Sequence, residues 1–258
     1  MLRGLFTAAS GMYASQRKTE MITNNMANAQ TPGFKADYSH IRAFPEMLIE
    51  RFNAGSNRSE QVGTLHTGVY VQEVIPRFIQ GDSLQTDRPT DLALMDRTDG
   101  TAFFSVEQNN EIKYTRNGKF TVDPEGILTT ENGWPVLDAN GNRIRVASEH
   151  FEVDEAGWIS ENGVQVARLG IVRSDNPENL SKEGDGLFST DINAGLPLAE
   201  NADFTLSQGF VEKSNVDVTR SMTDMITAYR TFEANQKMLQ AYDRSLDKAV
   251  NEIGRVNG

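Results

Sequence analysis

The oxygen-bearing side chains around residue 138 have the spacing that comes closest to a metal site. Asp138, Asn140 and Asn142 stand at positions one, three and five of a loop, and Glu149 stands at position twelve, as in a calcium-binding loop. The sixth position needs glycine for the bend, but Arg143 occupies it, and the flanking residues have strand patterns rather than helical ones. The segment is therefore interpreted as an Asn-Gly turn, with calcium binding as the alternative.

Other residues that could perform chemistry are isolated from suitable partners. Asp154 and Glu155 could be imagined as the carboxylate pair of a glycosidase, but adjacent strand residues point to opposite faces. The three histidines, His40, His66 and His150, are scattered without a second ligand at metal spacing. The sequence therefore predicts a protein that is not an enzyme, without catalytic, cofactor-binding or metal-binding residues. A cell-envelope hydrolase with a central carboxylate is the alternative from another class.

The composition describes an acidic chain of 258 residues without cysteine, enough for one large domain or two smaller ones. The net charge of −11 is concentrated in the middle, because residues 1–35 are basic overall and residues 210–258 carry seven charges of each sign. This acidity argues against nucleic acid as a partner. No apolar run is long enough to span a membrane. The first residues loosely imitate a signal peptide, but helical periodicity continues past Ala14.

The chain's first segment has the spacing of a helix that packs lengthwise on a partner. Its apolar and small residues alternate steps of three and four: Leu5, Ala8, Met12, Ser15, Thr19, Ile22, Met26 and Ala29. Several members of this seam are small or polar and not large and apolar, which suits close helix packing in an assembly. The helix is expected to end near residues 29–31, because Pro32 disfavours helical geometry before it and Gly33 follows.

A second and longer helix is predicted from about Asp217 to Ile253, because no Gly or Pro occurs between Gly209 and Gly254. Its seam is Val218, Met222, Met225, Tyr229, Phe232, Gln236, Leu239, Asp243, Leu246, Val250 and Ile253. At 1.5 Å per residue this helix would be roughly 55 Å long, more than an ordinary domain can contain. It must therefore project or join a bundle. The alternative is a core helix of one compact domain.

The middle of the chain has short β-type runs between turn residues. Asn117-Gly118 between strand-like runs in residues 113–122 predicts a hairpin. Residues 122–136 resemble residues 153–166, which predicts two similar hairpins in one sheet system. Residues 43–52 fit a short amphipathic helix that opens at Pro45, followed by a polar connection over 53–60. The expected division is an N-terminal helix 1–35, a connecting segment 36–68, a β-rich domain 69–208 and a C-terminal helix 209–258.

Three blocks of residues, in order along the chain, resemble the flagellar basal-body rod and hook protein family. The first block is Asn24-Asn-Met-Ala-Asn-Ala-Gln-Thr-Pro-Gly-Phe-Lys35. The second comprises Thr90-Asp-Leu-Ala-Leu94, Phe103-Phe104 and Tyr114-Thr-Arg-Asn-Gly-Lys-Phe120. The third comprises Gly209-Phe-Val-Glu-Lys-Ser-Asn-Val-Asp217, Met225-Ile226 and Tyr229-Arg-Thr-Phe-Glu-Ala-Asn-Gln-Lys237. The family usually has Gly-x-Gly before its Phe-Phe pair, and residues 95–102 depart from that pattern, so the local turn there is expected to differ.

The resemblance implies a structural subunit of the bacterial flagellar rod, most similar to the distal type, with a hook or hook-associated subunit as the alternative. Its terminal helices would form the inner axial layers, and the β domain would lie outside them. The implied partners are further copies of the chain, other rod and hook subunits and the flagellar export apparatus. The chain would be exported unfolded to the basal body without a cleaved signal.

The residues expected to serve self-assembly combine the helical seams with these blocks. They are Leu5, Met12, Ile22, Asn24, Asn25, Asn28, Pro32, Gly33, Phe34, Glu212, Ser214, Asn215, Val216, Met222, Met225, Tyr229, Arg230, Phe232, Asn235, Leu239 and Leu246. The three asparagines fit a helix end whose amides bond neighbouring backbone, or simple helix termination, and both can hold together. Residues 214–217 fit an N-cap cluster before the long helix, with a contact role for Asn215 as the sharper alternative.

Overall fold

The computed structural model describes residues 2–52, 59–190 and 195–251, and it divides the chain into two compact units. The first, here called the helical unit, comprises residues 1–26, 37–75 and 218–258. The second, here called the β unit, comprises residues 27–36 and 76–217. The expected fold class, a β-rich middle with a helix at each end, is confirmed. Within the described residues, neither helix has a stretch apolar enough to cross a membrane.

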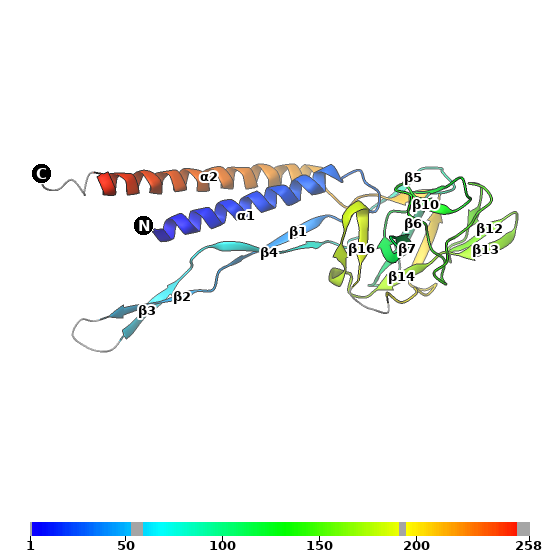
Figure 1. Ribbon diagram of the computed structural model, residues 1–258, viewed down its shortest axis with the longest axis horizontal. Coiled ribbons are helices and arrows are strands. Elements are labelled where there is room, and N and C mark those ends of the chain that lie inside the picture. The colour runs from blue at the N-terminus through cyan, green and yellow to red at the C-terminus, as the bar shows by residue number, and fades with distance from the viewer. Residues whose placement is uncertain (1, 53–58, 191–194, 252–258) are drawn as a thin grey trace, which may run out of the picture. The chain divides into compact units, whose positions relative to one another are not determined.

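The two long helices belong to the helical unit, where they run side by side in opposite directions (Figure 1). They are α1, Leu2–Ala27, and α2, Val218–Asn251. Glycines allow α1 to approach α2 closely, because a Cβ at Gly4 would collide with the Tyr242 ring and one at Gly11 would lie 2.9 Å from Nδ2 of Asn235. Both glycines, seven residues apart, therefore mark the face on which the two helices meet.

The predicted seams differ in how completely this pair covers them. On α1 every member of the seam is buried or half-buried. On α2 four members at one heptad position are half-buried, namely Met225, Phe232, Leu239 and Leu246, whereas Val218 at the same position is exposed. The members at the other heptad position are exposed: Met222, Tyr229, Gln236, Asp243 and Val250. The pairing of α1 with α2 therefore uses half of the α2 seam and leaves the other half uncovered.

Two paired ribbons complete the helical unit. Strand β1, Asp37–Ala43, pairs with β4, Val69–Pro76, and β2, Met47–Phe52, pairs with β3, Ser59–Leu65. The helix predicted for residues 43–52 is wrong, because β3 offers β2 an antiparallel partner from Leu65 to Ser59 that a local pattern cannot reveal. Of the connection predicted for residues 53–60, residues 53–58 lie outside the described residues and the last two open β3.

The β unit is built around a five-stranded sheet with the order β14-β7-β8-β16-β15. These strands are β7, Thr101–Gln108; β8, Glu111–Thr115; β14, Ile171–Ser174; β15, Ser181–Lys182; and β16, Leu187–Ser189. Smaller sheets pack against it, and they use β5, Ser83–Gln85; β6, Leu92–Asp96; β9, Phe120–Val122; β10, Leu128–Thr130; β11, Glu152–Val153; β12, Trp158–Glu161; β13, Val164–Arg168; β17, Phe204–Gln208; and β18, Phe210–Glu212. Short 3₁₀ turns, Pro177–Asn179 and Gly184–Gly186, flank β15.

The main core of this unit joins the five-stranded sheet to the small sheets. Phe104 and Phe120 meet edge to face there, with ring centroids 5.1 Å apart. A second cluster on the other side centres on Phe103 and Phe188. Because Phe103 and Phe104 are adjacent in β7, they point to opposite faces and supply both cores.

The hairpin predicted at Asn117-Gly118 is wrong. Strand β8 pairs with β7 and β16, whereas β9 pairs with β10. Gly118 instead lies against β6, where its carbonyl accepts the amide of Leu92 at 2.9 Å, and a Cβ at Gly118 would collide with the Leu92 carbonyl oxygen. Glycine is therefore needed here for close backbone approach and not for a tight turn.

The predicted repeat between residues 122–136 and 153–166 corresponds to two similar hairpins. Asp123 accepts the amides of residues 125 and 127, and Asp154 accepts those of residues 156 and 158, so both aspartates close the same turn. The expectation of one sheet system is wrong, because β9-β10 and β11-β12-β13 are separate sheets. Asp138 makes a third such turn with the amides of Asn140 and Asn142, which confirms the interpretation of that segment as a turn.

Candidate functional site: the terminal junction

Two segments from distant parts of the sequence meet on the β unit. Residues 27–36, here the N-terminal segment, follow α1, and residues 209–217, here the C-terminal segment, precede α2. The amide of Gly33 donates to the carbonyl of Glu212 at 2.8 Å, and the amide of Asn215 donates to the carbonyl of Phe34 at 3.4 Å. We call this meeting point the terminal junction. It brings together the first and third blocks of the family resemblance.

The C-terminal segment is held to the rest of the β unit by a short strand ladder. Strand β18 pairs antiparallel with β5, from Phe210 opposite Gln85 to Glu212 opposite Ser83. The next amide, that of Lys213, donates to the carbonyl of Asp82 at 2.8 Å. The ladder therefore fixes the backbone on both sides of Glu212 and sets the direction of its side chain.

Glu212 lies at the centre of a buried cluster of charges, and its side chain is only 2 % exposed. Its Oε2 accepts from Nε of Arg116 at 2.5 Å, and its Oε1 accepts from Nζ of Lys35 at 2.7 Å. The backbone amide of Gly81 donates to the same Oε1 at 2.8 Å. One carboxylate thus joins the N-terminal segment, the C-terminal segment and strand β8's end.

Arg116 uses all five of its N–H donors within this cluster. Besides Glu212, its two terminal nitrogens bond both oxygens of Asp96, at 2.8 and 3.0 Å. The remaining donors go to the carbonyls of Leu94 and Ala102. A guanidinium buried without exposed surface is tolerated because none of its donors lacks a partner. Lysine could not reproduce this planar set of bonds.

Burial and charge act in opposite directions on these groups. Burial lowers the pKa of Lys35 below its ordinary value, and the attraction of Glu212 does not reverse this. Burial alone would raise the pKa of Glu212, but the charges of Arg116 and Lys35 outweigh it and hold that pKa below its ordinary value. Burial likewise opposes the charge of Arg116, whose pKa is nevertheless raised by Glu212 and Asp96. Lys35 is therefore the group whose charge the cluster favours least.

Neighbouring residues of the N-terminal segment fix its path. Gly33 has a φ of +68°, and a Cβ there would lie within 2.5 Å of the amide nitrogen of Asn117. Phe34 is buried beneath Lys182, whose Nζ lies 3.9 Å from the ring centroid and donates to the carbonyl of Lys35 at 2.9 Å. Only glycine can adopt this turn at this distance from the β8–β9 connection.

The side chain of Asn215 bonds two other backbone segments, the end of the N-terminal segment and residues 77–79. Its Oδ1 accepts the amide of Ala36 at 2.7 Å, and its Nδ2 donates to the carbonyls of Arg77 and Ile79 at 2.8 and 3.0 Å. These bonds lie within one chain, and the contact role of Asn215 in self-assembly stays a prediction. Ser214 accepts the amide of Val216 at 3.4 Å, and the N-cap assignment for residues 214–217 stays a prediction.

The asparagines at the end of α1 have different surroundings. In the helical unit, Asn25 is buried and bonds the backbone of Asp37 in both directions, each bond being 2.8 Å long. In the β unit, Oδ1 of Asn28 accepts the hydroxyl of Thr31 at 3.2 Å. Asn24 lies on the exposed side of the last turn, and Pro32 is half-buried. Backbone bonding by a side-chain amide is thus confirmed for Asn25.

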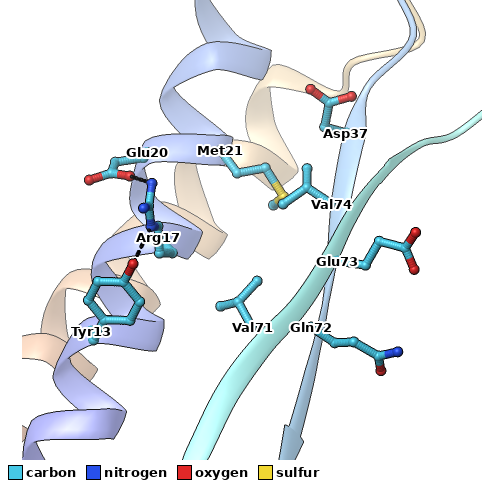
Figure 2. Close-up of a pocket in the computed structure, with 9 residues that line it drawn as sticks. All are labelled: Tyr13, Arg17, Glu20, Met21, Asp37, Val71, Gln72, Glu73 and Val74. Carbon is cyan, nitrogen blue, oxygen red and sulfur yellow. Dashed lines mark hydrogen bonds and ion pairs between the residues drawn. The ribbon is translucent and has the colours of Figure 1, made fainter. Parts of the chain in front are cut away.

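The remaining predicted residues lie on the helices. Leu5, Met12, Met225, Phe232, Asn235, Leu239 and Leu246 are half-buried, Ile22 is buried, and Met222, Tyr229 and Arg230 are exposed. Beside α1 the helical unit has an open groove of about 420 Å³, shown in Figure 2. Its lining residues are Tyr13, Arg17, Glu20 and Met21 from α1, Asp37 from β1, and Val71, Gln72, Glu73 and Val74 from β4.

Within the groove, Nε of Arg17 donates to the Tyr13 hydroxyl at 3.0 Å, and its Nη1 pairs with Glu20 at 3.2 Å (Figure 2). Tyr13 itself is 53 % exposed. Charged, polar and apolar side chains line the groove, and none of its lining residues comes from α2.

Arg116 and Asp96, which complete the buried cluster, were not among the predicted site residues. Arg116 belongs to a resemblance block, but no local pattern shows that its side chain points at Glu212, 96 positions away. Asp96 lies in the stretch that departs from the family pattern. A buried arginine needs acidic partners, but Arg116 is not distinguished locally, because Glu111 and Lys113 are charged residues of the same run.

The β unit fastens both terminal segments, and the helical unit has two long helices with exposed apolar side chains. These features are typical of a structural protein. Family models agree: residues 5–35 match "Flagella basal body rod protein", residues 98–173 match "Flagellar hook protein FlgE/F/G D1 domain", and residues 207–252 match "Flagellar basal body rod FlgEFG protein C-terminal".

Curated relatives match over nearly their whole length. The flagellar hook-basal body complex protein FlhO of Bacillus subtilis is 43 % identical, over 99 % of this chain and 100 % of its own. The flagellar basal-body rod protein FlgF of Caulobacter vibrioides is 33 % identical over 100 % of both, and FlgG of B. subtilis is 32 % identical over 97 % and 99 %. The chain therefore belongs to the flagellar basal-body rod protein family, and it is a structural protein of the flagellar basal body.

Proposed function

We propose that this chain is a rod subunit that polymerises with further copies of itself, and with other rod and hook subunits, through its two terminal helices. In this proposal the helical seams form the inner axial layers and residues 69–208 lie outside them. The observation that supports it best is the uncovered stripe on α2. Large apolar side chains on this stripe remain about half exposed: Met222 58 %, Ile226 52 % and Tyr229 56 %.

The stripe leaves large apolar side chains in water that a further helix could cover. Burying one such side chain fully contributes about 1.5–3 kcal/mol, so covering the stripe would favour association by several such increments. On α1, Phe6 and Tyr13 are also more than half exposed and stand seven residues apart. Heptad spacing on both helices is what lengthwise helix packing requires.

The two uncovered faces differ from each other. One is the α2 stripe, and the other is the Tyr13 face of α1 with its groove (Figure 2). A contact between unlike faces is heterologous, and heterologous contacts continue into open filaments unless rotation closes them into a ring. We therefore propose that the α2 stripe of one copy packs on the Tyr13 face of the next.

A mixing experiment tests this contact. Met222→Asp removes one face and Tyr13→Asp the other, and we expect each variant alone to remain monomeric where the unaltered chain assembles. An equimolar mixture keeps one intact pair of faces and should form a dimer that cannot elongate, visible by analytical ultracentrifugation. Failure of the mixture to dimerise would contradict the contact between unlike faces.

The matched control for this experiment is Thr231→Asp. Thr231 is also exposed, but it stands nine residues after Met222, which is half a turn away at 3.6 residues per turn. The control carries the same new charge outside the stripe, so assembly should be unchanged. Loss of assembly in this control would show that charge on α2, and not loss of the stripe, is responsible.

The position within the flagellum is the finer part of the proposal. A distal rod position agrees with the length of the β-rich middle, and a hook or hook-associated position is the alternative. We further propose export by the flagellar apparatus without a cleaved signal. Labelling the subunit in detergent-extracted basal bodies would locate it, and mass spectrometry of the recovered chain would reveal any cleavage after residue 14.

A further inference from the structure

The C-terminal segment has attachments of its own to the body of the β unit. Its strand pairs with β5, the amide of Gly209 donates to the Asp91 carbonyl at 2.8 Å, and the amide of Lys213 donates to the Asp82 carbonyl. The side chain of Glu212 adds the bonds to Arg116 and to the Gly81 amide. None of these bonds involves a residue of the N-terminal segment.

The N-terminal segment, by contrast, bonds both to the C-terminal segment and to other parts of the β unit. Gly33 donates to the carbonyl of Glu212, Lys35 to its side chain, and Ala36 to the side chain of Asn215. Its bonds to other parts of the β unit include Nζ of Lys35 to the carbonyl of Ile79 at 2.9 Å, the amide of Arg77 to the Ala36 carbonyl, and Nζ of Lys182 to the Lys35 carbonyl at 2.9 Å. Residues 212 and 215 therefore form a large part of the surface that holds the N-terminal segment, and Glu212 supplies its charged partner.

The charges make this dependence one-sided. Lys35 is 1 % exposed, and Glu212 is the carboxylate that its ammonium contacts. Without Glu212 the ammonium would be buried beside the positive Arg116, which is strongly unfavourable. Glu212 without Lys35 would keep a charge-assisted bond to Arg116 and the Gly81 amide. Removing Lys35 is thus compensated, whereas removing Glu212 is not.

We infer that the N-terminal segment docks on the β unit only when the C-terminal segment is already in place, with Arg116 positioning Glu212 as the acceptor for Lys35. The reverse does not hold, because the C-terminal segment can dock alone. This conditional docking goes beyond polymerisation: it makes the placement of residues 27–36, which come directly after α1, depend on the presence of residues 209–217. A chain whose C-terminal segment is missing leaves its N-terminal segment undocked.

Amide hydrogen exchange on the full chain tests the inference at two reporter positions. The amide of Gly33 reports the N-terminal segment, and the amide of Lys213 reports the C-terminal one. We expect Glu212→Gln to accelerate exchange at Gly33 at least tenfold. Lys35→Met should leave exchange at Lys213 within about twofold of the unaltered chain, a limit set by the few tenths of a kcal/mol expected from indirect effects.

A double variant separates a lost charge partner from general damage. Because the unpaired ammonium is what opposes docking in Glu212→Gln, adding Lys35→Met should restore slow exchange at Gly33. Amides of the β7–β14 pair report whether the β unit remains folded. If Glu212→Gln unfolds the β7–β14 pair, the inference is tested by the Lys35→Met variant alone, through the exchange rate of the Lys213 amide. Unchanged exchange at Gly33 in Glu212→Gln, no recovery in the double variant, or equal acceleration at both reporters in Lys35→Met would each overturn the inference.

Discussion

Oε2 of Glu212 lies 2.5 Å from Nε of Arg116, and both side chains are almost completely removed from water. This pair joins β18, the last strand of the β unit, to the residue that follows strand β8. It is the part of the terminal junction that does not depend on the N-terminal segment. Because neither charge has access to solvent, each depends on the other and on the bonds around it.

Replacing Arg116 by methionine removes the cation that pairs with Asp96 and with Oε2 of Glu212, so that only Lys35 and the Gly81 amide still bond the Glu212 carboxylate. Breaking a buried pair in this way typically costs about 3–5 kcal/mol, and we expect a loss of that size in the free energy of unfolding by urea. Arg143→Met is the control, since Arg143 pairs with Glu107 at the exposed surface. The urea midpoint should hardly move in the control. Equal effects of the two variants would contradict the role of burial.

The stability of the β unit should fall in acid through Glu212. In the folded chain the pKa of Glu212 lies below the ordinary value of 4.5, which the unfolded chain keeps. At a pH between the lowered pKa and 4.5, the unfolded chain therefore binds more protons than the folded chain, and unfolding becomes easier. The contribution is complete above pH 4.5 and is lost as the pH falls through the lowered pKa. The difference in unfolding free energy between the unaltered chain and Glu212→Gln should therefore shrink from pH 6 to about pH 2. A difference that stays constant over this range would exclude Glu212 as the titrating group.

Gly33→Ala should loosen the N-terminal segment. The new Cβ would need a φ of +68° and would collide with the backbone of Arg116 and Asn117, so we expect a loss above the 1 kcal/mol or so that a left-handed residue alone costs. Gly133→Ala is matched to it, with a φ of +82° and nothing within 4 Å of the added carbon. Comparing the melting temperatures of both variants separates the cost of the steric collision from the cost of the positive φ. Similar melting temperatures would contradict the collision.

Gly11→Leu should separate α1 from α2. A Cβ at Gly11 already comes within 2.9 Å of the side chain of Asn235, and a larger side chain would force the helices apart. The change in helix separation can be measured as the distance between spin labels on the two helices, or by thiol–disulfide exchange at a disulfide engineered between them. Gln16→Leu adds a similar side chain at an exposed position of the same helix and should leave the distance unaltered. An unchanged distance in Gly11→Leu would show that the helices meet elsewhere.

The long helices could be predicted from the sequence because their spacing is a local property. Leu239 and Leu246 are half-buried as the seam requires, but Met222 and Tyr229 on the same seam are exposed. Periodicity identifies an apolar face and does not say which partner covers it. The seam was therefore correct as a pattern, while only part of it is used within one chain.

Local patterns gave the wrong structure for residues 43–52, which were predicted as a helix, and for Asn117-Gly118, which was predicted as a hairpin turn. Met47–Phe52 became a strand because β3 supplies a partner, and Gly118 is required by its approach to Leu92. Both depend on residues distant in the sequence. The same holds for the junction: Lys35 and Glu212 were visible within the resemblance blocks, but Arg116 and Asp96 could be connected to them only in three dimensions.

The 2.8 Å bond between the Gly33 amide and the Glu212 carbonyl ties two points 179 residues apart in the chain. The chain between them leaves from one place and returns to it. It includes residues 37–75 of the helical unit as well as most of the β unit, so in topological terms residues 34–211 form an insertion whose entry and exit coincide. An insertion of this kind can grow, shrink or be exchanged without altering where its ends are fixed. The terminal junction thus provides a natural boundary at which the middle of this protein could vary while the ends keep their connection.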